Sequence, residues 1–164
     1  SSLTLDRHKG RAISYDVACP GLNYRMDEMR AALGIVQLEK LPQANKRRKE
    51  LFERYRVNLE NSKVAIPFSD FSANWHSVYH ILPVLLPIDC DRTTVIEKLK
   101  LEGIQSSIHY PPFWDFSGYE GWFSKYDTPI TAEVCDRELT LPLFPTMTDD
   151  EVDLVTTTLK EVIA

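Results

Sequence analysis

Apolar residues recur every three to four positions in the first third of the chain. This spacing predicts a helix from Met26 to about Asn61, either one rod or two segments joined at Pro42, because proline lacks an amide proton. The apolar positions are Met26, Met29, Leu33, Val36, Leu41, Leu51, Tyr55 and Leu59. Asp27 and Glu28 lie where the first turn of such a helix favours negative charge.

The rest of the chain alternates short apolar runs with capping and turn residues. The runs predict strands at 78–86, 104–109 and 139–143, and helices at 92–102, at 129–138 and after 148. Asp91, Thr128 and Thr148 occupy the expected N-cap positions, and Gly103 follows the first of these helices. The predicted fold class is therefore α+β, a mixed sheet of a few strands with helices packed against it and a long helix before it.

Composition and charge narrow the classes of partner. The 164 residues carry 19 basic and 24 acidic side chains, a net charge of −5, which does not suit a protein whose main partner is nucleic acid. The basic run 46–49 is interpreted as a solvated helix face. No apolar run approaches the roughly 20 residues that cross a bilayer. We expect neither a nucleic-acid nor a membrane partner.

The cysteines indicate a redox compartment. Cys19, Cys90 and Cys135 are scattered and form no Cys-x-x-Cys pair, so we expect reduced thiols in a cytoplasmic protein. Closely spaced ligand pairs are also missing among the histidines and cysteines, so we expect no metal site.

Two clusters carry candidate chemistry. At the start of the long helix, Asn23 and Arg25 add side-chain donors to free backbone amides, which favours an anion or phosphate site; alternatively Asn23 only caps the helix and Arg25 pairs with a carboxylate. Further on, His109 and Tyr110 open an aromatic loop that suits a sugar or a nucleotide base. The same aromatic residues could instead pack beneath the loop or form a subunit interface.

Four segments together resemble one known family. They are GLNYRMDEMRAALGIVQLEKL at 21–41, HSVYHILPVLLP at 76–87, EGIQSSIHYPPF at 102–113 and LTLPLFPTMTDDEVDLV at 139–155. In this order they resemble the C-terminal part of the DegT/DnrJ/StrS family of sugar aminotransferases, which depend on pyridoxal 5'-phosphate (PLP). The resemblance implies a fold-type-I enzyme, similar to aspartate aminotransferase, in which residues 1–60 are the tail of the cofactor domain with a connecting helix and residues 61–164 are the small C-terminal domain.

The resemblance also implies an activity and roles for particular residues. Family members transfer an amino group from glutamate or glutamine to a nucleotide-linked keto sugar, in polysaccharide or secondary-metabolite synthesis, and act as homodimers. Asn23, with Arg25 beside it, would bind the phosphate of PLP held by the neighbouring subunit. Tyr24, His109 and Tyr110 would contact the sugar nucleotide.

The family's catalytic lysine has no counterpart in these residues. That lysine forms a Schiff base with PLP and lies upstream of the motif at residue 21, whereas Lys9 stands in a different context. We therefore assign no catalytic residue and expect this polypeptide alone to be inactive. Two alternatives remain: a non-catalytic module that binds a sugar nucleotide or a protein, and a family variant that dehydrates its sugar.

Overall fold

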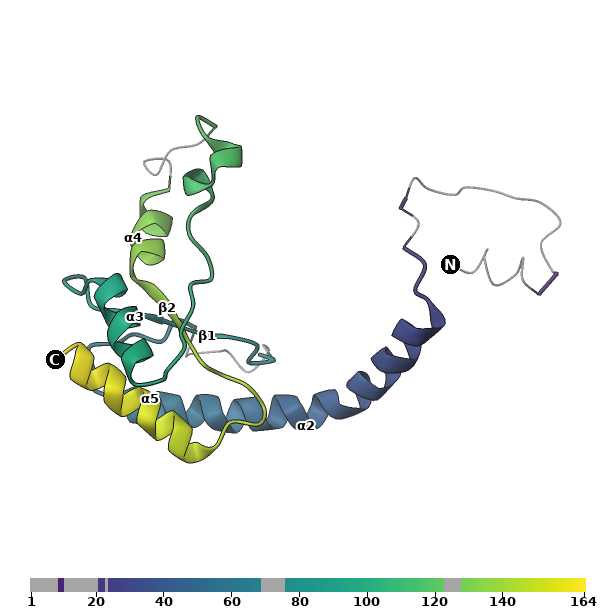
Figure 1. Cartoon of the computed structure of the whole chain (residues 1–164), viewed down its shortest axis with the longest axis horizontal. Helices are drawn as coiled ribbons and strands as arrows, with labels where there is room; N and C mark the ends of the chain where they lie inside the picture. The colour runs from purple at the N-terminus through teal and green to yellow at the C-terminus, as the bar shows by residue number, and fades with distance from the viewer. Residues whose placement is uncertain (1–8, 11–20, 23, 69–75, 123–127) are drawn as a thin grey trace. The chain divides into compact units, whose positions relative to one another are not determined.

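The computed structural model describes residues 9–10, 21–22, 24–68, 76–122 and 128–164. Its elements in chain order are α2 (Glu28–Leu59), β1 (Leu82–Leu85), α3 (Arg92–Leu101), the 3-10 turns η1 (Phe113–Asp115) and η2 (Ser117–Tyr119), α4 (Pro129–Arg137), β2 (Glu138–Leu141) and α5 (Asp149–Val162) (Figure 1). The chain divides into two compact units, residues 1–37 and 38–164, and the division falls within α2. The predicted domain boundary near residue 61 stays a prediction.

The long predicted helix is one element. α2 continues through Pro42, so the chain adopts the single rod rather than two joined segments. A proline inside a helix removes one hydrogen bond, here the one to the carbonyl of Leu38. Both residues are exposed, so water can reach the carbonyl that the proline leaves unpaired. This exposure explains why the helix tolerates the proline.

The apolar side chains of α2 behave differently along its length. Near the C-terminal end, Leu51, Phe52, Tyr55 and Leu59 are buried in the core. The earlier apolar positions are exposed, and they are Met29, Leu33, Ile35, Val36, Leu38 and Leu41. Only the last three turns of the helix therefore contribute to the hydrophobic core of unit 38–164.

The α+β class is confirmed, with a smaller sheet than predicted. β1 and β2 pair antiparallel, with Leu82 opposite Leu141 and Leu85 opposite Glu138. In the described residues this pair is the whole sheet, extended by isolated antiparallel bridges at Ala65–Leu85 and Ser107–Thr140. The predicted strand 78–86 is thus reduced to four residues, and the predicted strand 104–109 to the single bridge at Ser107.

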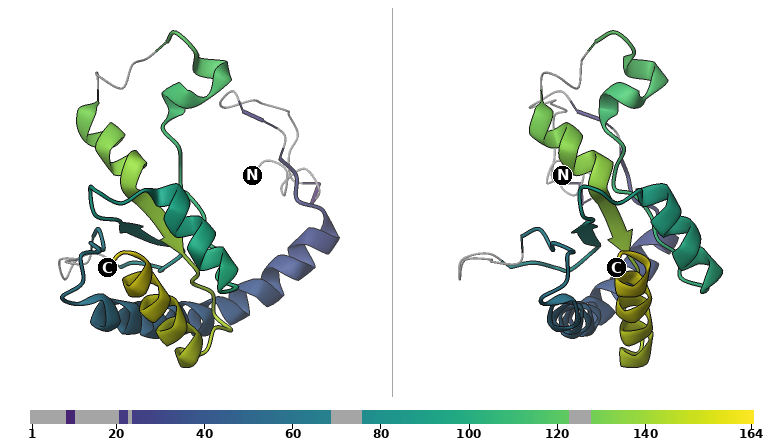
Figure 2. Two further views of the ribbon diagram at one scale, coloured as in Figure 1. Left: turned by 60° about the vertical axis from the view of Figure 1, so that its left-hand side comes forward. Right: turned by 90° about the vertical axis from the view of Figure 1, so that its left-hand side faces the viewer.

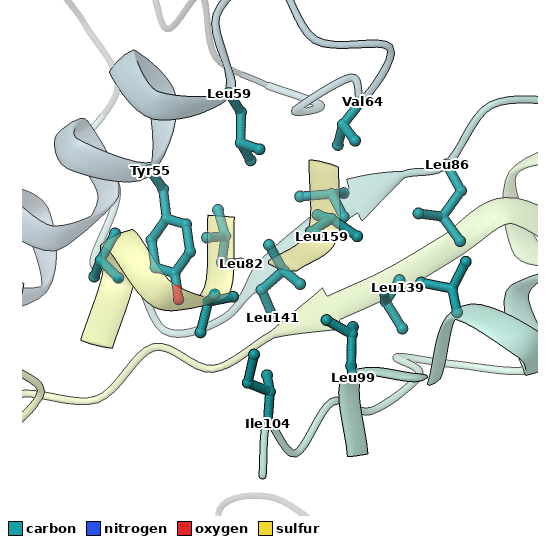
Figure 3. Close-up of a cluster of buried hydrophobic side chains, with 14 of the residues drawn as sticks. Tyr55, Leu59, Val64, Leu82, Leu86, Leu99, Ile104, Leu139, Leu141 and Leu159 are labelled. Atoms are coloured by element: carbon teal, nitrogen blue, oxygen red, sulfur yellow. The ribbon is translucent and has the colours of Figure 1, made fainter. Parts of the chain in front are cut away.

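The core lies where the two strands meet the helices. Figure 3 shows Tyr55 and Leu59 of α2 gathered with Leu82 and Leu141 of the strands. α3 packs against α5, and the buried side chains of these two helices close the same cluster (Figure 2). Its main helical contributors are Val95, Leu99, Val152, Val155 and Leu159. Burial of each large apolar side chain contributes about 1.5–3 kcal/mol, so the core is the main source of stability.

Polar contacts then hold α5 against α2. Arg54 donates two hydrogen bonds to the carboxylate of Asp153, at 2.8 and 2.5 Å. Arg47, from the basic run, donates to the carbonyl of Met147 and to Asp149 at the start of α5. Arg48, the next residue of the run, donates to the carbonyl of Val78 and to the side chain of Asn45. Two cations of the run therefore have structural partners within the chain, while Lys46 and Lys49 are exposed, as predicted for a solvated face.

Local capping signals are confirmed at two helices. The Asp91 carboxylate accepts from the amides of Thr93 and Thr94 at the start of α3. Thr148 and Glu151 form the predicted reciprocal capping box at the start of α5. Thr128 precedes Pro129 at α4, but its side chain makes no capping bond. Among the described helices, none combines the length and the apolar character that a membrane crossing needs.

We predict that Tyr55→Phe lowers the free energy of unfolding. The fully buried Tyr55 hydroxyl donates to the carbonyl of Pro142 at 2.9 Å, and the substitution leaves this half-buried acceptor unpaired. The expected loss is about 1 kcal/mol, measured by urea unfolding. Tyr110→Phe is the control, because the Tyr110 side chain is exposed and its substitution should change stability little. Equal stability of wild type and Tyr55→Phe would contradict the prediction.

The hydrogen bonds to the Asp153 carboxylate predict how the free energy of unfolding depends on pH. Hydrogen bonds from Arg54 and then from Asn58 lower the pKa of Asp153 from 3.8 to about 2. A carboxylate with a lowered pKa stabilises the folded state above its unfolded pKa and loses that contribution as the pH falls toward the folded pKa. Asp153→Asn should therefore be less stable than wild type near neutral pH, with a difference that shrinks between about pH 4 and pH 2.

The check is urea unfolding of both proteins across this pH range. Asp89→Asn is the matched control, since Asp89 is an exposed acidic residue on a loop. A difference between wild type and Asp153→Asn that stays constant down to pH 2 would contradict the assignment.

Candidate functional site

The predicted site residues fall in different parts of the chain. Asn23 lies outside the described residues. Tyr24 and Arg25 stand just before α2, in unit 1–37, and both are exposed, Tyr24 to 86%. His109 and Tyr110 follow the bridge at Ser107, in unit 38–164. His109 and Tyr110 therefore lie together in one unit, whereas Tyr24 and Arg25 belong to the other unit.

His109 is positioned by β2. Ser107 exchanges two backbone hydrogen bonds with Thr140, at 3.1 and 2.8 Å, so residues 107–109 run along the edge of β2 opposite to β1. The next backbone donor, the amide of His109, bonds to the side chain of Glu138 at 3.0 Å rather than to its carbonyl. Backbone pairing therefore ends after one bridge, and the Glu138 carboxylate accepts the next backbone hydrogen bond.

The Glu138 carbonyl has a different partner, Arg92. Its guanidinium, on the first residue of α3, donates to the carbonyls of Glu138 and Cys135. These acceptors lie where α4 ends and β2 begins. The arginine thus satisfies the carbonyl that a longer strand pairing would have used, and it ties α3 to the strand that carries the site.

The imidazole of His109 is bonded to the same strand. Its Nδ1 lies 2.9 Å from the hydroxyl of Thr140 and 3.4 Å from that of Ser107. The Thr140 hydroxyl in turn donates to Glu138 at 2.5 Å. In the described part of the chain Nε2 has no protein hydrogen bond, so this nitrogen is available to a ligand.

Tyr110 and the following loop supply flat apolar surface. The Tyr110 ring meets the His109 ring edge-on, with centroids 4.9 Å apart, and is 70% exposed. Within the loop, Phe113 packs edge-on against Trp114 and Tyr119, and Tyr119 packs against Trp122. These rings are partly covered by one another and partly exposed. The loop therefore shows features of both the packed and the ligand-binding interpretations.

The sequence interpretation missed two residues of this site, Glu138 and Thr140. Both are buried, at 6% and 5% exposure, and both contact His109. A signal was present, since residues 138–141 read Glu-Leu-Thr-Leu and alternate polar with apolar. Alternation of polar and apolar residues is typical of a strand with one solvent-exposed face. Here both polar side chains are buried, and both bond to His109 on the neighbouring segment, so this face supports the histidine.

The chemistry of the site is that of binding. An imidazole nitrogen beside an exposed phenol ring can hydrogen-bond and stack on a polar ligand that has a flat or sugar-like face. Within the residues that the structure describes, no group of three histidine, cysteine, aspartate or glutamate side chains is arranged to hold a metal ion.

Comparisons with known proteins identify relatives of the chain. Residues 3–160 match the DegT/DnrJ/EryC1/StrS aminotransferase family. The uncharacterized protein MJ1066 of Methanocaldococcus jannaschii is 33% identical over 155 residues, which cover 92% of this chain and 40% of that protein.

Solved structures of one protein are also similar. The Streptococcus pneumoniae protein Spr1654, assigned as a sugar aminotransferase, matches in its PMP form with a TM-score of 0.81 and 27% identity, over 96% of this chain and 40% of that chain. Its PLP form matches with a TM-score of 0.80 and 28% identity, over 92% of this chain and 39% of that chain. The chain thus spans about two fifths of the length of the proteins it matches.

Proposed function

The chain belongs to the DegT/DnrJ/EryC1/StrS aminotransferase family, and on that premise we propose that it is the C-terminal portion of an enzyme that transfers an amino group to a nucleotide-linked keto sugar. The amino donor is glutamate or glutamine, and the product serves polysaccharide or secondary-metabolite synthesis. One observation supports the proposal above the others: the family match extends over almost the whole chain, while the chain spans about two fifths of each relative.

PLP is the cofactor of this family, and Spr1654 has been solved in its PLP and PMP forms. When bound, PLP supplies the carbonyl that takes up the amino group and the ring that accepts electrons. Arg25 fits the phosphate of such a group, because its guanidinium is exposed and offers charged donors. We propose that Asn23 and Arg25 hold the phosphate of a PLP molecule bound by the partner subunit of a homodimer.

The sugar nucleotide is assigned to the second cluster. We propose that His109 provides a hydrogen bond through Nε2, that Tyr110 provides an apolar face, and that Tyr24 also contacts the sugar nucleotide. The support is the geometry of His109 and Tyr110, whose rings are in contact while the Tyr110 ring stays open to a ligand.

We propose further that these 164 residues alone do not catalyse amino transfer, because no lysine among them stands in the family's Schiff-base context. The alternative is a non-catalytic module that keeps the sugar-nucleotide or a protein-binding surface. The coding sequence immediately upstream separates the two: an in-frame domain with the lysine supports the enzyme, and its absence supports the module.

We predict that purified chain mixed with an equal amount of PLP carries no stoichiometric label on any one lysine after borohydride reduction. The reason is that the residue that would form a Schiff base is missing, so PLP has no site-directed amine to react with. Absorption spectra before and after borohydride, followed by mass spectrometry, provide the measurement. A lysine-bearing family member is the positive control. Stoichiometric labelling of one lysine in the chain would contradict the prediction.

We predict that Asn23→Ala weakens PLP binding to the complete enzyme roughly ten- to a hundredfold, since a hydrogen bond to a charged group contributes about 1.5–3 kcal/mol. The affinity is measured by equilibrium dialysis of PLP against the cofactor-free protein. Leu22→Ala is the matched control, because it shortens a neighbouring side chain that has no donor. Unchanged affinity in Asn23→Ala would remove the phosphate role from this residue.

A further inference from the structure

A charged residue lies buried behind the candidate substrate histidine, and no step of the proposed function uses it. Glu138 opens β2, is 6% exposed, and directs both carboxylate oxygens toward the residues that position His109. Burying a carboxylate is costly unless its oxygens accept hydrogen bonds. Here one oxygen accepts from the backbone amide of His109, and the other accepts from the hydroxyl of Thr140.

The direction of these bonds follows from counting protons. An ionised carboxylate only accepts, so the single proton of the Thr140 hydroxyl is committed to Glu138. The Thr140 oxygen can then only accept from Nδ1 of His109, 2.9 Å away. A neutral imidazole carries one proton, which must therefore be on Nδ1. Ser107 Oγ, at 3.4 Å, is the more distant contact and competes weakly.

We propose that Glu138 and Thr140 are positioning residues that hold neutral His109 with its proton on Nδ1, so that Nε2 faces the ligand as a hydrogen-bond acceptor. The identity of the ligand rests on the proposed function, whereas the position of the proton does not. An acceptor nitrogen selects a hydroxyl or amino group of the ligand and offers nothing to a phosphate oxygen. The sugar or ribose hydroxyls of a nucleotide sugar are thus the groups that Nε2 recognises.

The same two residues also hold the ring in place. Glu138 anchors the backbone amide of His109 while Thr140 anchors its side chain, so the residue is held at two points from one strand. Arg92 secures the carbonyl of Glu138, which links the start of the strand to α3. The tautomer and the orientation of the imidazole are therefore set by the fold before any ligand binds.

The isosteric variant Glu138→Gln tests the proton count directly. The glutamine oxygen must accept from the His109 amide, so its NH2 group faces Thr140 and donates to the hydroxyl oxygen. The hydroxyl proton then turns toward the imidazole, Nδ1 becomes the acceptor, and the ring proton moves to Nε2. The substitution keeps the shape of the side chain and reverses the donor and acceptor roles in the hydrogen bonds from residue 138 through Thr140 to His109.

The measurement is long-range proton–nitrogen NMR of the 15N-labelled chain, at the alkaline end of the histidine titration where the rings are neutral. His109→Gln identifies the signals by their loss. In wild type we expect Nε2 of His109 to show the chemical shift of an unprotonated nitrogen. In Glu138→Gln and Thr140→Val we expect Nδ1 to show it. Thr140→Ser, which keeps the hydroxyl, and Ser107→Ala, which removes the more distant contact, should both resemble wild type.

Two results overturn the proposal: wild-type His109 protonated on Nε2, or a folded Glu138→Gln variant that keeps its proton on Nδ1. Amide spectra report folding, and if Glu138→Gln does not fold, the comparison of Thr140→Val with Thr140→Ser decides in its place. Identical tautomers in those two variants overturn the proposal. The tautomer is read without ligand, so its outcome tests the position of the proton and is independent of whether the proposed function is correct.

Discussion

The antiparallel contact between β1 and β2 is the constraint on which the C-terminal unit depends. It places β2 in the interior, with all four of its residues buried. Because successive side chains of a strand point to opposite faces, Leu139 and Leu141 join the hydrophobic core while Glu138 and Thr140 lie on the other face. One four-residue strand therefore builds the core and supports the candidate site.

This arrangement connects the stability of the core with the position of the candidate site. The strand is held by β1 on one edge and by Ser107 on the other, and the helices α2, α3 and α5 contribute the side chains that enclose it. A histidine attached to such a strand through its amide and its ring has little freedom to move. Tyr110, one residue later, is largely exposed. The change from a residue bonded at its amide and its ring to a largely exposed one thus occurs between two neighbouring residues.

The two ends of α2 differ in the burial of their apolar side chains. Its last turns carry buried side chains, and its polar residues bond to α5 through Arg47 and Arg54. Its earlier apolar side chains are exposed in the described chain. The relatives of which this chain spans about two fifths contain further residues.

Local features of the chain were predictable from the sequence because their cause is local. The Asp91 cap, the capping box of Thr148 and Glu151, and the positive φ of Gly103 depend on residues within one turn. The resemblance to the aminotransferase family likewise rested on contiguous motifs. The single helix through Pro42 was one of two open alternatives, since the outcome depends on whether water reaches the Leu38 carbonyl.

The sequence by itself determined the α+β class, most helix starts and the family, because periodicity, caps and motifs lie in neighbouring residues. Only the tertiary structure decided how far the strands extend and what supports His109. The segment 104–109 forms one bridge instead of a strand. Beyond the bridge, the His109 amide bonds to the Glu138 side chain, and the Glu138 carbonyl accepts from Arg92, seventeen residues before His109. Glu138 became part of the candidate site because His109, distant in the chain, bonds to its carboxylate, and no pattern along the chain records such a contact.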